Sequence, residues 1–254
     1  TLKHTPQGIK DMYGEIYRLL NNSPELVVFY NGPKCGASAP EHAHLQAGVP
    51  SILPLTDSWQ RLSRETTTIV KLSENDEIAV INEYPCPALV IRCHSAEAGE
   101  QLFREFYEAY ESDGSNETNG TNESEPMMNI VAWRRGDEYL SVIFPRAKHR
   151  PACYGDIMVS PGALDMAGLI ITPREEDFNR LTAEQAVSIL QEELIRAKVL
   201  PQDYDFESHK QLVPMQPGDV PVTYADTSAL ERDFGFKPST PLRQGLRRFA
   251  EWYA

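Results

Sequence analysis

The sequence predicts an α+β fold built on an antiparallel sheet, from three observations. Apolar segments of strand length recur along the chain, and two of them, 128–134 and 139–144, flank a Gly136-Asp137 turn as a β-hairpin would. Segments with helical periodicity stand apart from these strands instead of alternating with them. The chain has 254 residues, of which 41% are hydrophobic, so it has enough material for a sizeable core.

The remaining elements are expected in this order: a helix at 8–21, strands at 26–30, 43–48, 78–83 and 87–93, a helix at 95–111, the hairpin, a strand at 167–172, and helices from 175 and from 182 to 198. The first helix ends at Asn21-Asn22-Ser23-Pro24, because proline stops a helix. Thr182 is a suitable N-cap for the last of these helices.

Two segments differ in character from the predicted sheet. Residues 112–126 are acidic and rich in Ser, Asn and Gly, which predicts a mobile surface loop. Its three N-x-S/T triplets are not expected to be glycosylated, because no secretory signal precedes them. After Leu200, prolines punctuate a loop-rich segment closed by a helix at about 240–253, which predicts an appended loop-rich helical unit.

Charge and composition exclude several classes of function. The formal net charge is −13, so the chain is not expected to bind nucleic acid or an anionic membrane surface. No apolar run is long enough to span a bilayer. The four cysteines form no C-x-x-C pair, which favours free thiols in the cytoplasm over a zinc site or a disulfide framework. The chain starts at Thr1 without an initiator Met, so we expect a truncated N-terminus.

Residues 31–46 carry the densest cluster of reactive side chains. His42, His44 and Gln46 alternate, so on a strand all three would share one face at about 6–7 Å spacing. The small-residue loop before them lets backbone N–H groups approach an anion. An imidazole held beside a phosphate can attack phosphorus. The alternatives are a solvated strand face with two incidental histidines, or a His-x-His metal pair, for which further ligands are missing nearby.

The segment His42-Ala43-His44-Leu45-Gln46, preceded by Gly36-Ala37-Ser38, resembles the H-x-H-x-Q signature of the histidine-triad-like (HIT-like) transferases. That branch includes galactose-1-phosphate uridylyltransferase, diadenosine tetraphosphate phosphorylase and GDP-L-galactose phosphorylase. A second stretch, 160–168 with 174–178, is similar to a segment of the GDP-sugar phosphorylases. The resemblance implies a HIT-like nucleotidyltransferase domain over about 1–188.

The resemblance also implies a role for each motif residue. His44 would be the nucleophile that attacks the α-phosphorus of a nucleotide or nucleotide-sugar substrate, and His42 would orient it. Gln46 would hold a phosphate oxygen without titrating, which favours transferases and phosphorylases over hydrolases. Asn31 and Ser38 occupy positions at which the family contacts phosphate.

Basic residues provide further candidates for phosphate binding. Lys34 is assigned from its charge and position alone. Arg146 and His149 belong to a basic cluster that follows the second hairpin strand, and such a cluster could grip a phosphate or simply balance the acidic loop at 112–126. No resident metal is predicted, although Mg²⁺ could accompany the nucleotide.

The tail, over about 189–254, resembles the C-terminal end of UDP-glucuronate 4-epimerases, on residues such as Met215-Gln216-Pro217-Gly218-Asp219 and Phe234-Gly235-Phe236-Lys237-Pro238. The glycine-rich dinucleotide motif of such enzymes is missing, so no NAD is expected. A Tyr-x-x-x-Lys pair at Tyr30 and Lys34 cannot lie on one helix, because Asn31-Gly32-Pro33 separates them.

The favoured hypothesis is an enzyme that performs nucleotidyl transfer or phosphorolysis through a nucleotidyl-histidine. The alternatives are a nucleotide-sugar binding module without turnover, a redox epimerase-related fragment, and a scaffold. Apolar residues of the tail such as Phe234, Phe236 and Trp252 could promote homo-oligomer formation.

Overall fold

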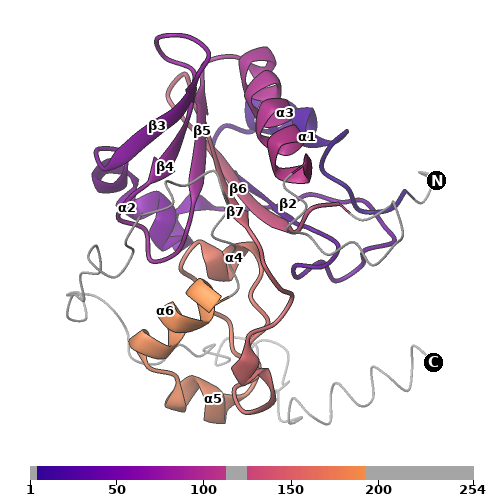
Figure 1. The fold of residues 1–254 in the computed structure, drawn as a ribbon, viewed down its shortest axis with the longest axis vertical. Coiled ribbons are helices and arrows are strands. Elements are labelled where there is room, and N and C mark those ends of the chain that lie inside the picture. Colours follow the sequence, from indigo (N-terminus) through magenta and orange to yellow (C-terminus); the bar gives the residue numbers. More distant parts are fainter. Residues whose placement is uncertain (1–4, 113–124, 193–254) are drawn as a thin grey trace, which may run out of the picture. The chain divides into compact units, whose positions relative to one another are not determined.

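A seven-stranded antiparallel sheet forms the centre of the fold, in the order β2-β1-β6-β7-β5-β4-β3 (Figure 1). The computed structural model describes residues 5–112 and 125–192, and all of them belong to one unit. The strands are β1 (Val27–Asn31), β2 (Gln46–Gly48), β3 (Thr66–Lys71), β4 (Glu77–Ile81), β5 (Leu89–Cys93), β6 (Met128–Arg135) and β7 (Glu138–Pro145). The predicted α+β class and the hairpin of β6 and β7 are confirmed.

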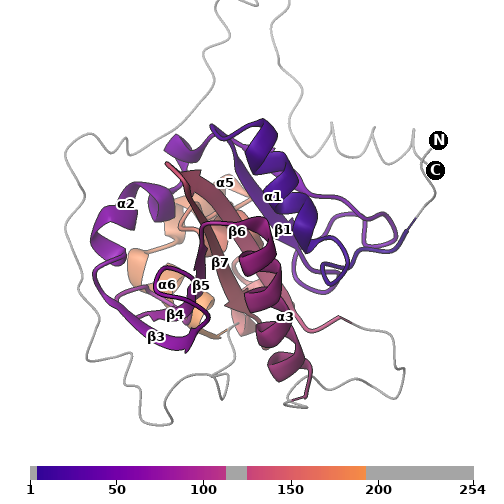
Figure 2. The same cartoon turned by 90° about the horizontal axis from the view of Figure 1, so that it is seen from above.

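Helices cover both faces of this sheet (Figure 2). The α-helices are α1 (Tyr13–Asn22), α2 (Pro54–Leu62), α3 (Ala96–Ser112), α4 (Ala163–Met166), α5 (Glu175–Arg180) and α6 (Ala183–Glu192), with short 3₁₀ turns η1 (Pro50–Ile52) and η2 (Ala152–Gly155). Helices α1 and α3 pack on one face, while α2, α4 and α6 contribute to the core on the other. None of the described helices is both long and apolar enough to cross a bilayer.

The two cores are filled by opposite faces of the same strands. In β1, Val28 and Tyr30 join the core under α1 and α3, whereas Val27 and Phe29 join the other core. Burial on both faces explains why this strand is a continuous apolar run in the sequence. Because side chains alternate along a strand, Asn31 continues the Val27 and Phe29 face and lies at the edge of the second core.

Two predicted strands differ from the observed structure. The strand expected at 43–48 is only three residues long, so His42 and His44 precede it and do not share a strand face with Gln46. The strand expected at 167–172 does not form. Instead Gly168, with φ of +97°, ends the short helix α4, and the Asp165 carboxylate accepts a bond from the backbone N–H of Ile171.

Other expectations agree with the structure or lie outside it. Thr182 caps α6 as predicted, because its hydroxyl accepts from the Gln185 N–H while the Gln185 side chain accepts from the Thr182 N–H. Helix α2 and the edge strand β3 were not expected from the sequence. The predicted loop at 112–126 falls mostly on residues 113–124, which lie outside the described part, as do 193–254 with the predicted tail helix.

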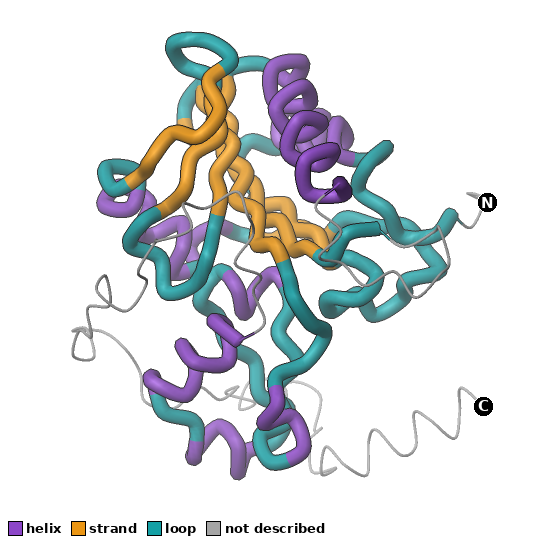
Figure 3. Tube along the Cα trace, in the orientation of Figure 1, coloured by secondary structure: helices purple, strands orange, loops and turns teal. Residues whose placement is uncertain are grey.

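The chain between β7 and α4 is a long irregular segment, interrupted only by η2 (Figure 3). It carries residues 160–163 back to the ends of β1 and β6, since the Ala163 N–H donates to Asn31 and the Arg146 guanidinium donates to Pro161 O. The two stretches singled out in the sequence, 31–46 and 160–168, therefore meet in space.

Candidate functional site

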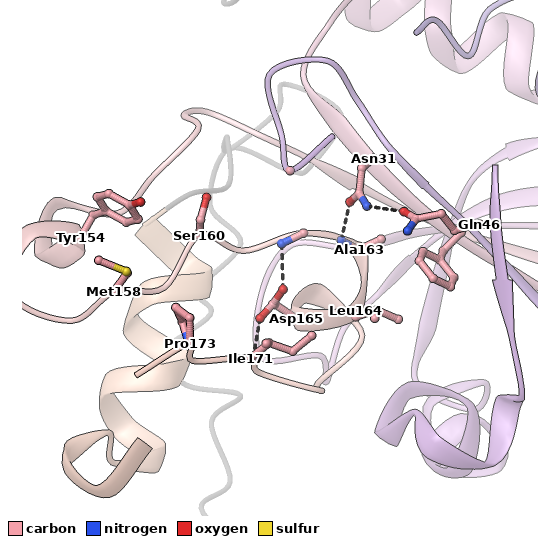
Figure 4. Close-up of a pocket in the computed structure, with 13 residues that line it drawn as sticks. Asn31, Gln46, Tyr154, Met158, Ser160, Ala163, Leu164, Asp165, Ile171 and Pro173 are labelled. Carbon is pink, nitrogen blue, oxygen red and sulfur yellow. Dashed lines mark hydrogen bonds between the residues drawn. The ribbon is translucent and has the colours of Figure 1, made fainter. Parts of the chain in front are cut away.

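A pocket of about 350 Å³ opens where β1, β2 and the segment before α4 meet (Figure 4). Its lining residues are Phe29, Asn31, Gly36, Gln46, Tyr154, Met158, Ser160, Gly162, Ala163, Leu164, Asp165, Ile171 and Pro173. Most of the wall is apolar, and a polar corner is formed by Asn31, Gln46 and the 160–163 segment. Such a wall with few oriented polar groups is typical of small-ligand sites.

The polar corner is ordered around the Asn31 carboxamide. Its Nδ2 donates to Gln46 Oε1 at 3.0 Å, and its Oδ1 accepts from the backbone N–H of Ala163 at 2.8 Å (Figure 4). Asn31 ends β1, and Gln46 begins β2, which pairs with β1. The sheet and the start of α4 thus fix both side chains at the pocket.

Behind this corner lie two buried polar side chains, Asn129 and Arg146. Asn129 of β6 is the ladder partner of Asn31 and donates its Nδ2 to Asn31 Oδ1 at 2.8 Å. Arg146 is fully buried and donates Nη1 to Asn129 Oδ1 at 2.5 Å and to the Pro161 carbonyl at 2.9 Å. Arg146 does not line the pocket, so its predicted contact with phosphate would require a rearrangement.

Two glycines allow three segments to converge on Asn31. A Cβ added at Gly162 would lie 3.0 Å from Asn31 Oδ1, and one added at Gly36 would lie 3.1 Å from the Gly162 Cα. Gly36 also has φ of +93°, which disfavours any larger residue. Gly36, which belongs to the small-residue loop singled out in the sequence, therefore packs closely against the polar corner.

The His44 ring has a defined hydrogen-bonding direction. Its Nδ1 lies 2.7 Å from the backbone carbonyl oxygen of His42. A carbonyl oxygen can only accept, so Nδ1 carries the hydrogen and Nε2 is the unprotonated nitrogen of the neutral ring. His42 thus acts on His44 through its backbone, and an imidazole with a bare Nε2 is suited to nucleophilic attack.

The Gln7 side chain holds the His44 backbone. Gln7 Oε1 accepts from the His44 N–H at 2.7 Å, and Gln7 Nε2 donates to the His44 carbonyl at 3.1 Å and to the Asn31 carbonyl at 3.0 Å. Gln7 is buried. It joins the end of β1 to the segment that carries His44, where β2 has not yet begun.

Of the predicted site residues, only Asn31 and Gln46 line the pocket; His42, His44 and the remaining phosphate-ligand candidates do not. Lys34 is exposed in a turn, and its carbonyl accepts from the His149 Nδ1 at 2.8 Å, so these two predicted residues are brought together. Ser38 is exposed and does not line the pocket. Tyr30 is buried with its hydroxyl bonded to Glu125 at 2.6 Å, and it forms no helical pair with Lys34.

Burial raises the pKa of three groups in this part of the chain: Cys35, Asp165 and Glu125. It raises the pKa of the Cys35 thiol to about 12, so this cysteine is no thiolate nucleophile. Burial also raises the pKa of Asp165, whose two oxygens accept from the Gly162 and Ile171 N–H groups. Burial raises the pKa of Glu125, which also accepts from the Ile9 N–H, to about 7.

Across 5–112 and 125–192, no three His, Cys, Asp or Glu side chains come together as a metal site. The sequence reasoning missed Gln7 and Asn129, because their importance depends on backbone groups and a buried partner far along the chain. It also missed the apolar wall formed by residues such as Phe29 and Leu164. The ladder position of Asn129 opposite Asn31 was the one available signal, and it required the strand register.

Comparison with known proteins shows partial matches to two groups. Residues 1–49 match a family model described as a domain of unknown function, DUF4922. A short segment is 47% identical over 47 residues to Protein CapI of Staphylococcus aureus, covering 18% of this chain and 14% of that protein. Another comparison gives 56% identity over 36 residues with UDP-glucuronate 4-epimerase 2 of Arabidopsis thaliana, or 14% of this chain and 8% of that protein. Part of the chain therefore resembles UDP-glucuronate 4-epimerases, and the chain spans only a small fraction of these relatives.

The fold matches that of the yeast Ap4A phosphorylase Apa2 with a TM-score of 0.50 at 16% identity, over 76% of this chain and 63% of that structure. The predicted α+β fold with an antiparallel sheet and flanking helices is thereby confirmed, and it resembles the fold of this Ap4A phosphorylase.

Proposed function

We propose that this chain transfers a nucleoside monophosphate group from a nucleoside diphosphate sugar or a dinucleotide polyphosphate, through a covalent nucleotidyl-His44 intermediate. The observation that carries the proposal is the bond from His44 Nδ1 to the His42 carbonyl, which leaves Nε2 free to attack. The fold shared with Ap4A phosphorylase and the pocket beside Gln46 support it.

In the first step the Nε2 lone pair of His44 attacks the α-phosphorus. A P–N bond forms, and the bond from the α-phosphorus to its bridging oxygen breaks. The leaving phosphate compound departs with that electron pair. The imidazole becomes positively charged, and the His42 carbonyl, which accepts from Nδ1, stabilises that charge because a hydrogen bond to a charged group is stronger.

In the second step an oxygen of inorganic phosphate or a sugar phosphate attacks the same phosphorus. A P–O bond forms, the P–N bond breaks, and its electron pair returns to Nε2. Gln46 does not titrate and supplies no general base to activate water. We therefore place the acceptor among phosphate compounds.

The pocket suggests how the nucleotide lies. Apolar side chains such as Phe29, Leu164 and Ile171 would contact the base, and the polar corner at Gln46 would contact the phosphates. His44 stands two residues before Gln46 along the chain, so the reacting phosphorus would sit at the rim of the pocket. Mg²⁺ would accompany the substrate phosphates, and no NAD is used.

The proposal is tested by the mass of the intact protein after incubation with UDP-glucose, GDP-mannose, ADP-glucose or diadenosine tetraphosphate. The expected result is a gain of one nucleoside monophosphate in the wild type and none in His44→Ala. His94→Ala is the matched control, since this histidine is partly exposed beyond β5 and its backbone N–H bonds Asp76. Saturable binding without any adduct would replace the proposal by a binding module.

A further inference from the structure

Four side chains form one connected line from the buried interior to the pocket: Arg146, Asn129, Asn31 and Gln46. Arg146 directly follows β7. Asn129, Asn31 and Gln46 lie on β6, β1 and β2, respectively. Three of the four are carboxamides, whose oxygen and nitrogen ends differ only in hydrogen-bonding sense. The direction of each amide is therefore a property that its partners must fix.

The inner end of the line is fixed by Arg146. A guanidinium has donors and no acceptor, so the Asn129 atom 2.5 Å from Arg146 Nη1 must be its oxygen. The Asn129 nitrogen then donates to the Cys35 carbonyl at 2.7 Å, a group that can only accept. Two partners of unambiguous character give the same orientation of Asn129.

The orientation of the next carboxamide, that of Asn31, is fixed by two donors. Asn129 Nδ2 donates to Asn31 Oδ1 at 2.8 Å, and the backbone N–H of Ala163 donates to the same oxygen at 2.8 Å. A backbone N–H has no acceptor capacity, so Asn31 must present its oxygen inward. Its Nδ2 is left to donate outward to Gln46 Oε1 at 3.0 Å.

We refer to the hydrogen-bonded line of Arg146, Asn129, Asn31 and Gln46 as the relay. We propose that the relay sets the direction of the Gln46 carboxamide, with its oxygen bound to Asn31 and its N–H₂ end directed to the pocket that it lines (Figure 4). The site then favours a ligand group that only accepts hydrogen bonds. Naming that group a phosphoryl oxygen rests on the proposed function, whereas the direction of the amide does not. Arg146 is then a positioning residue that acts through Asn129 and Asn31.

The relay makes the opposite orientation of Gln46 a minor one. Turning the amide over would bring its Nε2 against Asn31 Nδ2, so that two donors face each other and one hydrogen bond is lost. Losing one such bond makes the population of the turned-over Gln46 amide about tenfold smaller than that of the observed orientation. Asn31 cannot turn over to accommodate it, because Ala163 and Asn129 both donate to its oxygen.

The test is the exchange of side-chain amide protons in the ¹⁵N-labelled full chain, compared with Asn31→Asp. In the wild type, the Asn129 NH₂ protons should exchange slowly and those of Gln46 rapidly. In Asn31→Asp the outer atom of residue 31 becomes an acceptor, so Gln46 should turn over and donate to it. We expect its NH₂ exchange to slow about tenfold or more.

Slowly exchanging Gln46 NH₂ protons in the wild type would overturn the inference, and that measurement needs no variant. An unchanged Gln46 exchange rate in folded Asn31→Asp would overturn it as well. Adding inorganic phosphate should shift the Gln46 NH₂ signals in the wild type and not in Asn31→Asp. These readouts are independent of adduct formation, so a chain that forms no nucleotidyl-histidine could still show the relay.

Discussion

The Gln7 carboxamide bonds both backbone groups of His44, accepting from its N–H at 2.7 Å and donating to its carbonyl at 3.1 Å. The ladder between β1 and β2 pairs Phe29 with Gln46, and its extension by two residues would pair Asn31 with His44. Gln7 occupies that position instead, since it also donates to the Asn31 carbonyl. The Gln7 side chain thus replaces the strand hydrogen bonds and fixes the backbone of His44, two residues before the pocket residue Gln46.

Replacing Gln7 should therefore destabilise the fold and disturb His44. Gln7→Ala removes three hydrogen bonds from a buried side chain, and we expect a loss of about 2–3 kcal/mol in the free energy of unfolding, measured by urea denaturation. Gln191→Ala is the matched control, because it removes one bond to the Pro85 carbonyl, and about 0.5 kcal/mol is expected. Equal losses in the two variants would contradict this role of Gln7.

The contact between Gly162 and Asn31 gives a second prediction. In Gly162→Ala the new methyl group would lie 3.0 Å from Asn31 Oδ1 and would push that side chain away. We expect nucleotide affinity, measured by calorimetry, to fall about fivefold to tenfold, as for one weakened hydrogen bond. Gly155→Ala has no atom within 4 Å of the added Cβ and should bind as the wild type does. Unchanged affinity in Gly162→Ala would show that the position of Asn31 does not matter for binding.

Glu125 should make stability depend on pH. Burial raises its pKa to about 7 from an ordinary value of 4.5. Between these values the folded chain keeps the proton that the unfolded chain has lost, so the free energy of unfolding falls as pH rises from about 4.5 to 7. The expected fall is up to about 3 kcal/mol.

In Glu125→Gln the decrease in stability between pH 5 and pH 8 should be smaller by this amount, as measured by urea denaturation at both pH values. Glu111→Gln, an exposed partner of Lys10, is the control and should keep the wild-type dependence. If Glu125→Gln kept the wild-type decrease, Glu125 would not be the group responsible.

Arg146 should contribute more to stability than an exposed arginine. Arg146→Met leaves Asn129 Oδ1 and the Pro161 carbonyl without their donor inside the protein, which costs about 2–4 kcal/mol. Thermal denaturation should show a markedly lower midpoint than for Arg64→Met, since Arg64 is exposed after α2. Similar midpoints would mean that the buried guanidinium is dispensable.

Periodicity predicted much of this fold because many segments bury one consistent face. The apolar runs of β6 and β7 fill the cores on both faces of the sheet, and the apolar stripe of α3 fills the core under α1 and α3. The strand predicted at 167–172 failed because a single positive-φ glycine and the bonds of Asp165 outweigh the local apolar pattern. Edge strand β3 was missed because two of its three threonines are exposed, and threonines carry little hydrophobic signal.

The candidate site was predictable only in part, for a physical reason. Gln46 and Asn31 could be found from the motif and do line the pocket. Gln7 and Asn129 act through hydrogen bonds to residues 37 and 98 positions away, and no local pattern marks such partners. The assumption of a regular strand through His44 was wrong, because a side chain replaced the ladder there.

The most direct test of the account is to locate the nucleotide on the protein. After incubation with the donor that labels the chain, the peptide carrying His44 would be isolated and the P–N bond assigned by ¹H–³¹P correlation NMR. We expect phosphorus on Nε2 of His44, since Nδ1 donates to the His42 carbonyl. Phosphorus on Nδ1, a label on His42, or no label from any donor would contradict it.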